Sequence, residues 1–100
     1  MNCRIEFSAF VKTDLKEIDD WYRKINKKLL LRFYEEFENE VKFLRENPLS
    51  KEKKYNDCRI CYLKDFPFGI HYKYDDLSNS ILIIGIYHTS RNPKIWQTRL

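Results

Sequence analysis

The fold of this chain is decided by its last third, residues Phe66 to Arg99, which read FPFGIHYKYDDLSNSILIIGIYHTSRNPKIWQTR. Apolar residues alternate with others from Ile70 to Tyr74, a polar turn follows, and an apolar run then extends from Ile81 to Tyr87. This pattern predicts a β-hairpin, with His71 and Lys73 on a solvent-facing side of its first strand. Because the second run is apolar on both faces, we expect a central strand covered on both sides.

Upstream of the hairpin, the sequence predicts one strand and two helices. Apolar and charged residues alternate in Cys3–Phe7, which is typical of a short strand with one buried face. The helix that follows can begin after Ser8, although Thr13 and Asp14 are competing starts. Its apolar residues recur at three- and four-residue spacing until Asn26 breaks it. A second apolar stripe runs from about Lys27 to Glu46, and Asn47-Pro48 ends that helix.

Large apolar residues also lie off the two helical stripes. They are Trp21, Leu29, Leu31, Tyr34 and Phe43. The stripes themselves are expected to form core, whereas these additional residues are more than the outer surface of a monomer needs. A docking surface on the helices is therefore an open alternative.

A lysine-rich connector at residues 49–57 leads to a strand at Arg59–Leu63, and residues 65–68 turn into the hairpin. The order is β-α-α-β-β-β, an α+β fold in which a helical hairpin packs on an antiparallel sheet. The 100 residues contain 43% hydrophobic and 16% aromatic residues and only two glycines. We therefore expect a single domain spanning residues 1–100.

The positive charge of the chain is concentrated in its second half. Residues 1–50 carry ten Lys/Arg and ten Asp/Glu, whereas residues 51–100 carry nine and five, which accounts for the net charge of +4. A positive surface in the second half favours a polyanion or an acidic protein as partner. A basic face that only keeps the protein in solution is the alternative.

Three cysteines, an odd number, and a first segment MNCRIEFSAF without the apolar core of a signal peptide indicate reduced thiols and a cytoplasmic location. Cys58-Arg59-Ile60-Cys61 has C-x-x-C spacing, but in a strand its two thiols point to opposite faces, so no metal site is predicted. No cofactor is expected. No apolar run approaches the ~20 residues that span a membrane, so no membrane partner is expected either.

Three motifs carry a resemblance to a known family. They are Arg59-x-x-x-Leu63, Phe66-Pro67-Phe68-x-Ile70-x-Tyr72, and Ile83-x-x-Ile86-x-His88-x-x-Arg91-x-Pro93-x-x-Trp96-x-x-Arg99. Together with the order of elements, they resemble the RelE/ParE superfamily of bacterial toxins. The resemblance implies a growth-inhibiting toxin of a type II toxin–antitoxin module, neutralised by a cognate antitoxin whose flexible segment wraps it. A homodimer and a toxin–antitoxin hetero-oligomer are both open as assemblies.

The last of these motifs resembles ParE-type members, which inhibit DNA gyrase. This target requires an exposed basic and aromatic surface, and Arg and Trp are frequent anchors at interfaces. The target-binding residues expected on this interpretation are Lys51, Lys53, Lys54, Arg91, Lys94, Trp96 and Arg99.

The alternative is a RelE-like endonuclease that cuts mRNA on the ribosome. Its catalytic residues would be His88, Arg91 and Arg59, since imidazole is the side chain best suited to proton transfer near neutral pH and guanidinium groups stabilise phosphorane-like charge. Trp96 weakens this hypothesis, because RelE-type enzymes tend to place a tyrosine there and an indole cannot exchange a proton in its place. A third hypothesis is a binding module that has lost toxicity.

Several of these residues also have purely structural interpretations. Arg59 can form an ion pair with Asp57 or Asp65, and His88 can hydrogen bond to backbone at the end of its strand. Trp96 can pack on the sheet, and a solvated loop is the simplest role for the connector lysines.

Overall fold

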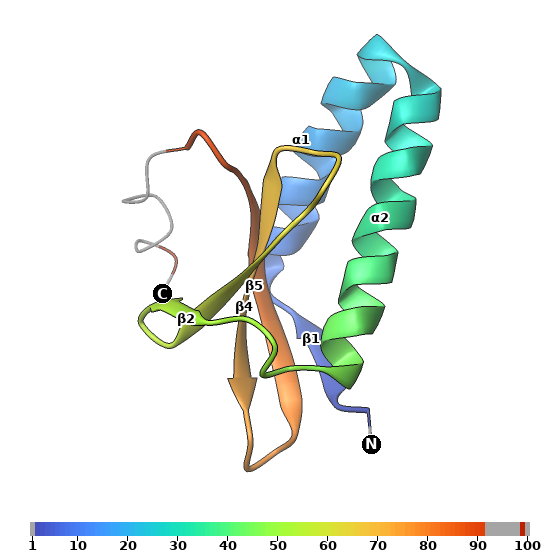
Figure 1. Ribbon diagram of the computed structural model, residues 1–100. Coiled ribbons are helices and arrows are strands. Elements are labelled where there is room, and N and C mark those ends of the chain that lie inside the picture. Colours follow the sequence, from blue (N-terminus) through green and yellow to red (C-terminus); the bar gives the residue numbers. More distant parts are fainter. Residues whose placement is uncertain (1, 92–98, 100) are drawn as a thin grey trace.

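The computed structural model describes residues 2–91 and residue 99. Two helices lie on one face of a five-stranded sheet (Figure 1). The elements are β1 (Arg4–Phe7), α1 (Ala9–Ile25), α2 (Lys27–Glu46), β2 (Lys53–Tyr55), β3 (Cys58–Tyr62), β4 (Phe68–Asp75) and β5 (Ser80–His88). The predicted α+β class, with a helical hairpin packed on a sheet, is confirmed.

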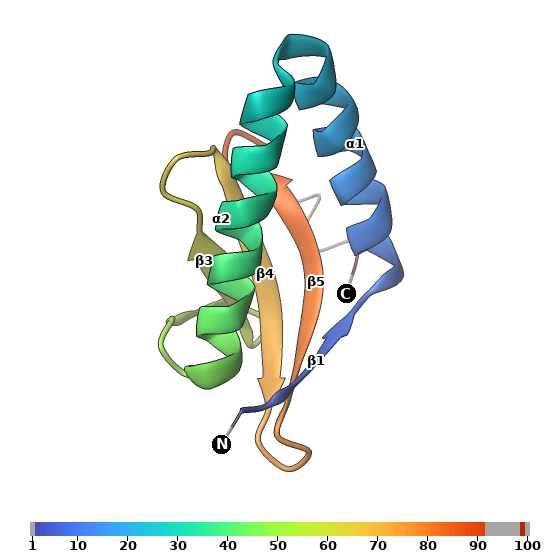
Figure 2. The same cartoon turned by 90° about the vertical axis from the view of Figure 1, so that its right-hand side faces the viewer.

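The sheet has the strand order β1-β5-β4-β3-β2. Strands β3, β4 and β5 form the predicted antiparallel meander. Strand β1 differs from the prediction, because it pairs parallel to β5, with Ile5 opposite Ile81. The two helices carry the chain away from β1 and back, and Figure 2 shows β1 beside β5 at the edge of the sheet. The sheet is therefore mixed, and β5 is a central strand as predicted.

Strand β2 arises within the connector, where the sequence predicted a loop. Lys53–Tyr55 pairs antiparallel with the start of β3. The turn between them contains Asn56 and Asp57, which have positive φ angles of 41° and 64°. Asn and Asp tolerate this left-handed conformation better than other non-glycine residues, and it suits tight hairpins. The Asn-Asp pair was the sequence feature from which this hairpin could have been predicted.

The main core lies between the helices and the sheet and is rich in aromatic rings. Phe33 of α2 is fully buried, and its ring centroid lies 5.5 Å from that of Phe66 and 5.7 Å from that of Phe68, edge to face in both cases. Tyr22 of α1 stacks on Phe33 at 6.2 Å. Such pairs add about 0.5–1.5 kcal/mol each to area burial. This cluster ties both helices to β4.

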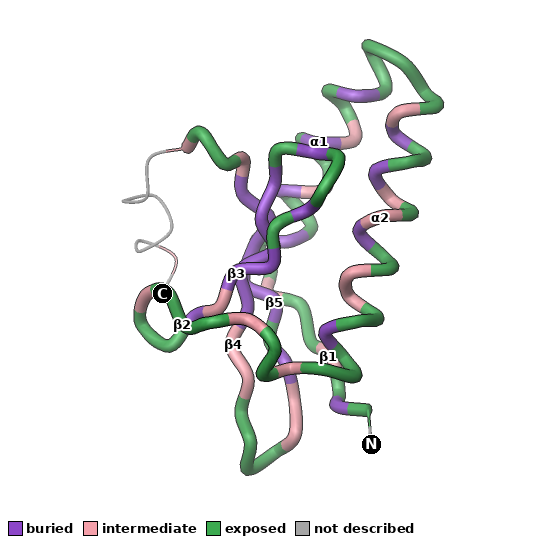
Figure 3. Tube along the Cα trace, in the orientation of Figure 1, coloured by how far each residue is buried: buried purple, intermediate pink, exposed green. Residues whose placement is uncertain are grey.

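The opposite face of the sheet is also largely covered. His71 is only 1% exposed, so its predicted solvent-facing position is wrong. Ile60, Ile84 and Tyr87 are buried with it, and Figure 3 shows buried residues along the centre of the sheet. A register shift between β4 and β5 beside His71 inserts Ile84 as an extra residue. Because His71 is a polar residue, the sequence did not indicate that this second face of the sheet is buried.

The exposure of several apolar residues differs from what the sequence pattern predicted. Phe7 is 53% exposed, although the alternation in β1 predicted it on the buried face. Its strand is at the edge of the sheet, and the chain turns into α1 directly after it. Among the residues off the helical stripes, Leu29 and Tyr34 pack against the core, whereas Trp21 is exposed.

Within the described part of the chain, no helix is long and apolar enough to cross a membrane.

Candidate functional site

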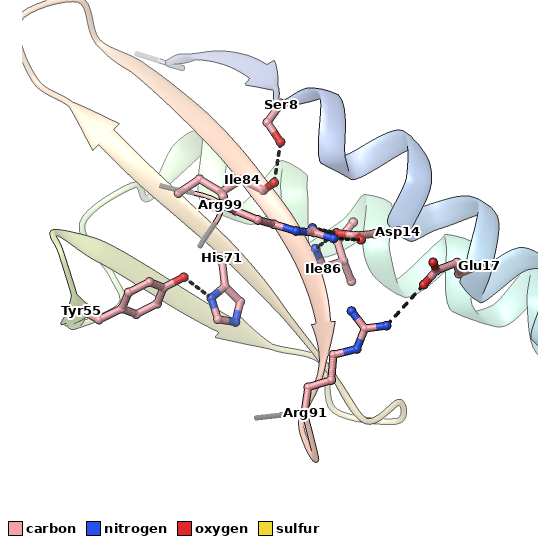
Figure 4. A network of polar contacts seen from close by, with 9 residues as sticks. All are labelled: Ser8, Asp14, Glu17, Tyr55, His71, Ile84, Ile86, Arg91 and Arg99. Carbon is pink, nitrogen blue, oxygen red and sulfur yellow. Dashed lines mark hydrogen bonds and ion pairs between the residues drawn. The ribbon is translucent and has the colours of Figure 1, made fainter. Parts of the chain in front are cut away.

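The end of β5 and the start of α1 form one polar junction (Figure 4). Strand β1 pairs with β5 only as far as Ile83. Beyond that point, the Ser8 hydroxyl donates to the Ile84 carbonyl at 2.5 Å, and the Ile86 N–H donates to Asp14 Oδ2 at 3.0 Å. Ser8 is the N-cap of α1 but makes no side-chain cap bond, because its hydroxyl is used in this way. The side chains of Ser8 and Asp14 thus bond the edge of β5 where β1 no longer pairs with it.

Asp14 also binds Arg99 through two parallel hydrogen bonds. Arg99 Nη1 lies 2.8 Å from Asp14 Oδ2, and Nη2 lies 3.0 Å from Oδ1. The side chain of Asp14 is 2% exposed and that of Arg99 is 16% exposed. The guanidinium carbon lies 4.6 Å from the ring centroid of Phe10 and 4.9 Å from that of Tyr87. The hydrogen bonds to Asp14 raise the pKa of Arg99 above its ordinary value, so this cation is held in an aromatic and acidic setting.

Gly85 provides the space for this arrangement. A Cβ atom at this position would lie 2.8 Å from Tyr87 Cζ and 2.9 Å from Asp14 Oδ2. Both distances are closer than real side chains allow, so the carboxylate and the tyrosine ring occupy the volume that a larger residue would need. Neither Asp14 nor Gly85 was identified from the sequence as a site residue. A glycine inside the apolar run 81–87, and an aspartate on the buried stripe of α1 near Ile18, were the available signs.

His88 and Arg91 lie at the end of β5, near the middle of α1. The Ser90 N–H donates to His88 Nδ1 at 3.1 Å, so the local backbone bond proposed as a structural role for His88 is confirmed. The imidazole meets the ring of Phe68 edge to face at 5.3 Å. Arg91 Nη2 lies 3.4 Å from Glu17 Oε2, and both side chains of this pair are exposed. His88 and Arg91 also line a shallow pocket that opens beside α1.

The predicted basic connector lies toward the opposite edge of the sheet, around β2 and β3. Arg59 donates from Nη1 to the backbone carbonyl of Lys51. Lys53 pairs with Asp57 at 3.4 Å. Lys54 has a comparable exposed pair with its neighbouring glutamate, at 3.5 Å. Lys53 and Lys54 are thus partly neutralised by nearby carboxylates, whereas Arg59 is held by a backbone carbonyl.

The ion pair considered for Arg59 is not formed. Asp57 binds Lys53, and Asp65 lies 3.9 Å from Arg32 of α2. Since Lys51 precedes β2 in the chain, the bond from Arg59 to its carbonyl instead closes the β2–β3 hairpin against the end of the loop that follows α2.

The structure separates the sequence-predicted residues into two groups. Arg59 pairs with Tyr72 on β4, whereas His88 pairs with Phe68, four residues earlier on the same strand. This offset corresponds to about 13 Å along the sheet, with β4 in between. Arg91 and Arg99 are brought together, because both bind acidic residues of α1. Lys94 and Trp96 lie outside the described residues.

On the sheet face away from the helices, buried His71 forms a polar contact with partly buried Tyr55. Tyr55 Oη lies 2.7 Å from His71 Nδ1, and the His71 ring meets Tyr87 edge to face at 4.5 Å. Burial lowers the pKa of His71 to about 4 and raises the pKa of Tyr55. Near neutral pH both groups are therefore uncharged, which suits a structural role.

The two cysteines of the C-x-x-C sequence cannot share a metal ion. Cys61 is part of the core under the helices and donates its S–H to Glu40 Oε2 at 3.1 Å, and burial raises its pKa to about 12. Cys58 is buried three residues earlier on the same strand and is not part of that core. Among the described residues, no group of three or more His, Cys, Asp or Glu side chains is placed to hold a metal.

Comparison with known proteins finds one matching family model and several solved structures of similar fold. The family model for the ParE toxin of the type II toxin–antitoxin system parDE matches residues 5–93. A search of curated proteins finds no significant match. Among solved structures, the chromosomal ParDE system of P. aeruginosa contains a chain with a TM-score of 0.74 and 20% identity, and the match covers 88% of this chain and 97% of that one.

Two further solved structures share the fold. A mutant of the E. coli toxin RelE in the free state has a TM-score of 0.62 and 17% identity, with coverage of 97% of this chain and 93% of that one. The toxin–antitoxin complex RelBE2 of Mycobacterium tuberculosis has a TM-score of 0.56 and 15% identity, with coverage of 88% and 99%. At these identities the likeness describes the fold alone.

Proposed function

The chain belongs to the ParE toxin family of type II toxin–antitoxin systems, and on this premise we propose that it inhibits DNA gyrase by binding it. The family match over residues 5–93 is the observation that carries this proposal. Within the described part of the chain, Arg91 is the exposed cation that follows the central strand β5. We propose that it contacts gyrase together with Lys94 and Trp96, since Arg and Trp are typical anchors of protein interfaces.

The separation of the predicted residues supports binding over catalysis. Phosphodiester cleavage requires the acid–base group and the cations that stabilise charge to surround one phosphate. His88 and Arg59 are offset by about 13 Å along the sheet and lie on non-adjacent strands. A binding surface makes no such demand, because cations spread over several nanometres can each meet a separate partner.

The test is a supercoiling assay with purified gyrase. The chain is expected to inhibit supercoiling, and Arg91→Gln to raise the concentration for half-inhibition at least about tenfold. Arg23→Gln is a matched control, because Arg23 also forms an exposed pair, with Asp19 of the same helix. It should inhibit as the unmodified chain does. Supercoiling and gyrase-dependent DNA cleavage that stay unchanged at molar excess of the chain would overturn the proposal.

We further propose that an antitoxin covers the groove between β1 and α2. Ile5, Phe7, Phe37 and Val41 give this groove an apolar floor. Its charged residues are of both signs: Lys42, Arg45, Glu38 and Glu46. Strand β1 is at the edge of the sheet, so a partner segment can add a strand there and place apolar side chains in the groove. The expected partner segment is extended and apolar on the side that faces the groove.

This partner is tested by co-purification with the protein encoded by the adjacent gene. Phe7→Ser should weaken the complex at least about tenfold, because it removes an exposed aromatic ring from the groove. Leu77→Ser is the matched control, since Leu77 is an even more exposed apolar residue in the β4–β5 turn. Equal weakening by both variants would rule out the groove as the docking site.

A ribosome-dependent endonuclease is the second candidate, because the fold is shared with RelE and the connector lysines and His88 are present. It predicts transcript cleavage in a translating extract, and loss of cleavage in His88→Ala and Arg91→Ala. Intact transcripts in an extract whose translation is otherwise normal would exclude it.

A further inference from the structure

One flank of α1 carries four residues that lie beside Arg91 or Arg99. Phe10, Asp14, Glu17 and Trp21 follow one another at spacings of four, three and four residues, which places them in one row along the helix. Phe10 stacks on Arg99, Asp14 binds it, Glu17 binds Arg91, and Trp21 lines the pocket beside Arg91. We call this row the α1 flank.

The α1 flank holds its two arginines in different ways. Arg99 is bound bidentately by a carboxylate that is 2% exposed, and it stacks on two aromatic rings. Arg91 makes one contact, at 3.4 Å, with Glu17, and their side chains are 39% and 60% exposed. An exposed pair of this kind contributes little to stability, whereas breaking a buried pair leaves an uncompensated charge in the protein interior.

This difference assigns different roles to the two residues. Arg91 can exchange Glu17 for another carboxylate at little cost, because both groups already lie in water. Arg99 cannot leave Asp14 without leaving a buried carboxylate whose remaining bond, among the described residues, is the one from the Ile86 N–H. In addition, the Asp14 oxygen that receives this N–H also receives Arg99 Nη1, so the pair is connected to the edge of β5.

We propose that Asp14 is a positioning residue that fixes Arg99 as an anchor of the fold, and that Arg91 is the cation that exchanges Glu17 for an acidic side chain of the target protein. The second half of this proposal rests on the proposed gyrase inhibition. The first half rests on the geometry of Asp14 and Arg99 alone. Arg99 is accordingly removed from the set of residues expected to touch the target.

The test compares Arg99→Gln, Asp14→Asn with Arg99→Gln, and Arg91→Gln in denaturant unfolding of the full chain. Arg99→Gln should lower the folding equilibrium constant at least about 100-fold, because Asp14 becomes a buried unpaired charge. Adding Asp14→Asn should recover most of this loss, because the amide is neutral and its oxygen can still accept from Ile86. Arg91→Gln should change the constant less than about threefold.

Gyrase inhibition by the same variants provides the second readout. The double variant should inhibit nearly as well as the unmodified chain, whereas Arg91→Gln should inhibit at least about tenfold less well. A stable double variant that fails to inhibit would show that Arg99 itself touches the target. If the double variant is as unstable as Arg99→Gln, or if Arg99→Gln is as stable as the unmodified chain, the proposed role of Asp14 and Arg99 is wrong.

The two proposals fail in distinguishable ways. If the unmodified chain does not inhibit gyrase, the proposed function fails together with the role of Arg91, while the unfolding measurements still decide whether Asp14 anchors Arg99. If the chain inhibits and Arg91→Gln inhibits equally well, the exchange at Glu17 is wrong while gyrase inhibition stands.

Discussion

Ser8 and Ile84 lie 76 positions apart in the sequence, and the Ser8 hydroxyl donates a 2.5 Å hydrogen bond to the Ile84 carbonyl. Ile84 is buried, so loss of the donor leaves a carbonyl with one partner fewer at a site with little access to water. Ser8→Ala should therefore lower the free energy of unfolding by about 1–2 kcal/mol, as measured by denaturant titration.

The matched control for this change is Ser78→Ala, since the Ser78 hydroxyl bonds Asp75 in the exposed β4–β5 turn. It should cost less than about 0.5 kcal/mol. Equal losses in the two variants would mean that the Ser8 bond contributes nothing beyond an ordinary surface contact.

Gly85→Ala should destabilise the chain by about 1–3 kcal/mol. The new methyl group would lie 2.8 Å from the Tyr87 ring and 2.9 Å from the Asp14 carboxylate, and both groups are buried. Thermal unfolding measures the effect. Gly69→Ala provides a comparison, because its Cβ would meet side chains of Ile60 and Tyr62, and Tyr62 is exposed and can move. A larger loss for Gly69→Ala would contradict this ranking.

His71 makes stability depend on pH. Burial lowers its pKa from 6.5 to about 4, so the unfolded chain binds a proton more readily than the folded one. The contribution is fully present above about pH 6.5 and is lost as the pH falls toward 4. Between pH 7 and 4.5 it amounts to about 2 kcal/mol.

The check on His71 is the free energy of unfolding at both pH values in two variants. His71→Phe should flatten the dependence by about that 2 kcal/mol. Tyr55→Phe retains the buried imidazole and should keep the slope. An unchanged slope in His71→Phe would assign the pH dependence to other groups.

Cysteine thiols should react slowly in the folded chain. All three are buried, and burial raises the pKa of Cys3, Cys58 and Cys61. Since the thiolate is the reactive form, a disulfide reagent at pH 8 should modify none of them within minutes and all of them in denaturant. Rapid modification of a thiol under native conditions would show that the fold opens locally around it.

The hairpin at residues 66–88 could be predicted, because alternation in β4, a polar turn and a doubly apolar β5 each depend only on neighbouring residues. The helices were predictable for the same reason. The parallel pairing of β1 could not be predicted, since nothing in the sequence around Ile5 or Ile81 indicates that the two residues are partners. The short hairpin of β2 was missed because its lysines resembled a solvated loop, although Asn56-Asp57 signalled the turn.

The candidate site was predicted less completely than the fold. Arg91 and Arg99 were identified by type and spacing, but their partners Glu17 and Asp14 lie more than 70 positions away. Asp14 looked like one of several helix-starting residues, whereas its place on the apolar stripe of α1 was the physical sign of a buried charge. Burial of His71 likewise depends on what covers the sheet, which alternation within one strand does not reveal.

The pairing of β1 with β5 has a consequence during synthesis. Strand β1 is synthesised first, but it can pair with β5 only after residues 80–83 have been made. The bond between Asp14 of α1 and the Ile86 N–H likewise requires residue 86. Contacts this distant in sequence form slowly and together. A growing chain therefore has no finished sheet, and any harm it can do to the cell begins only after β5 has been translated.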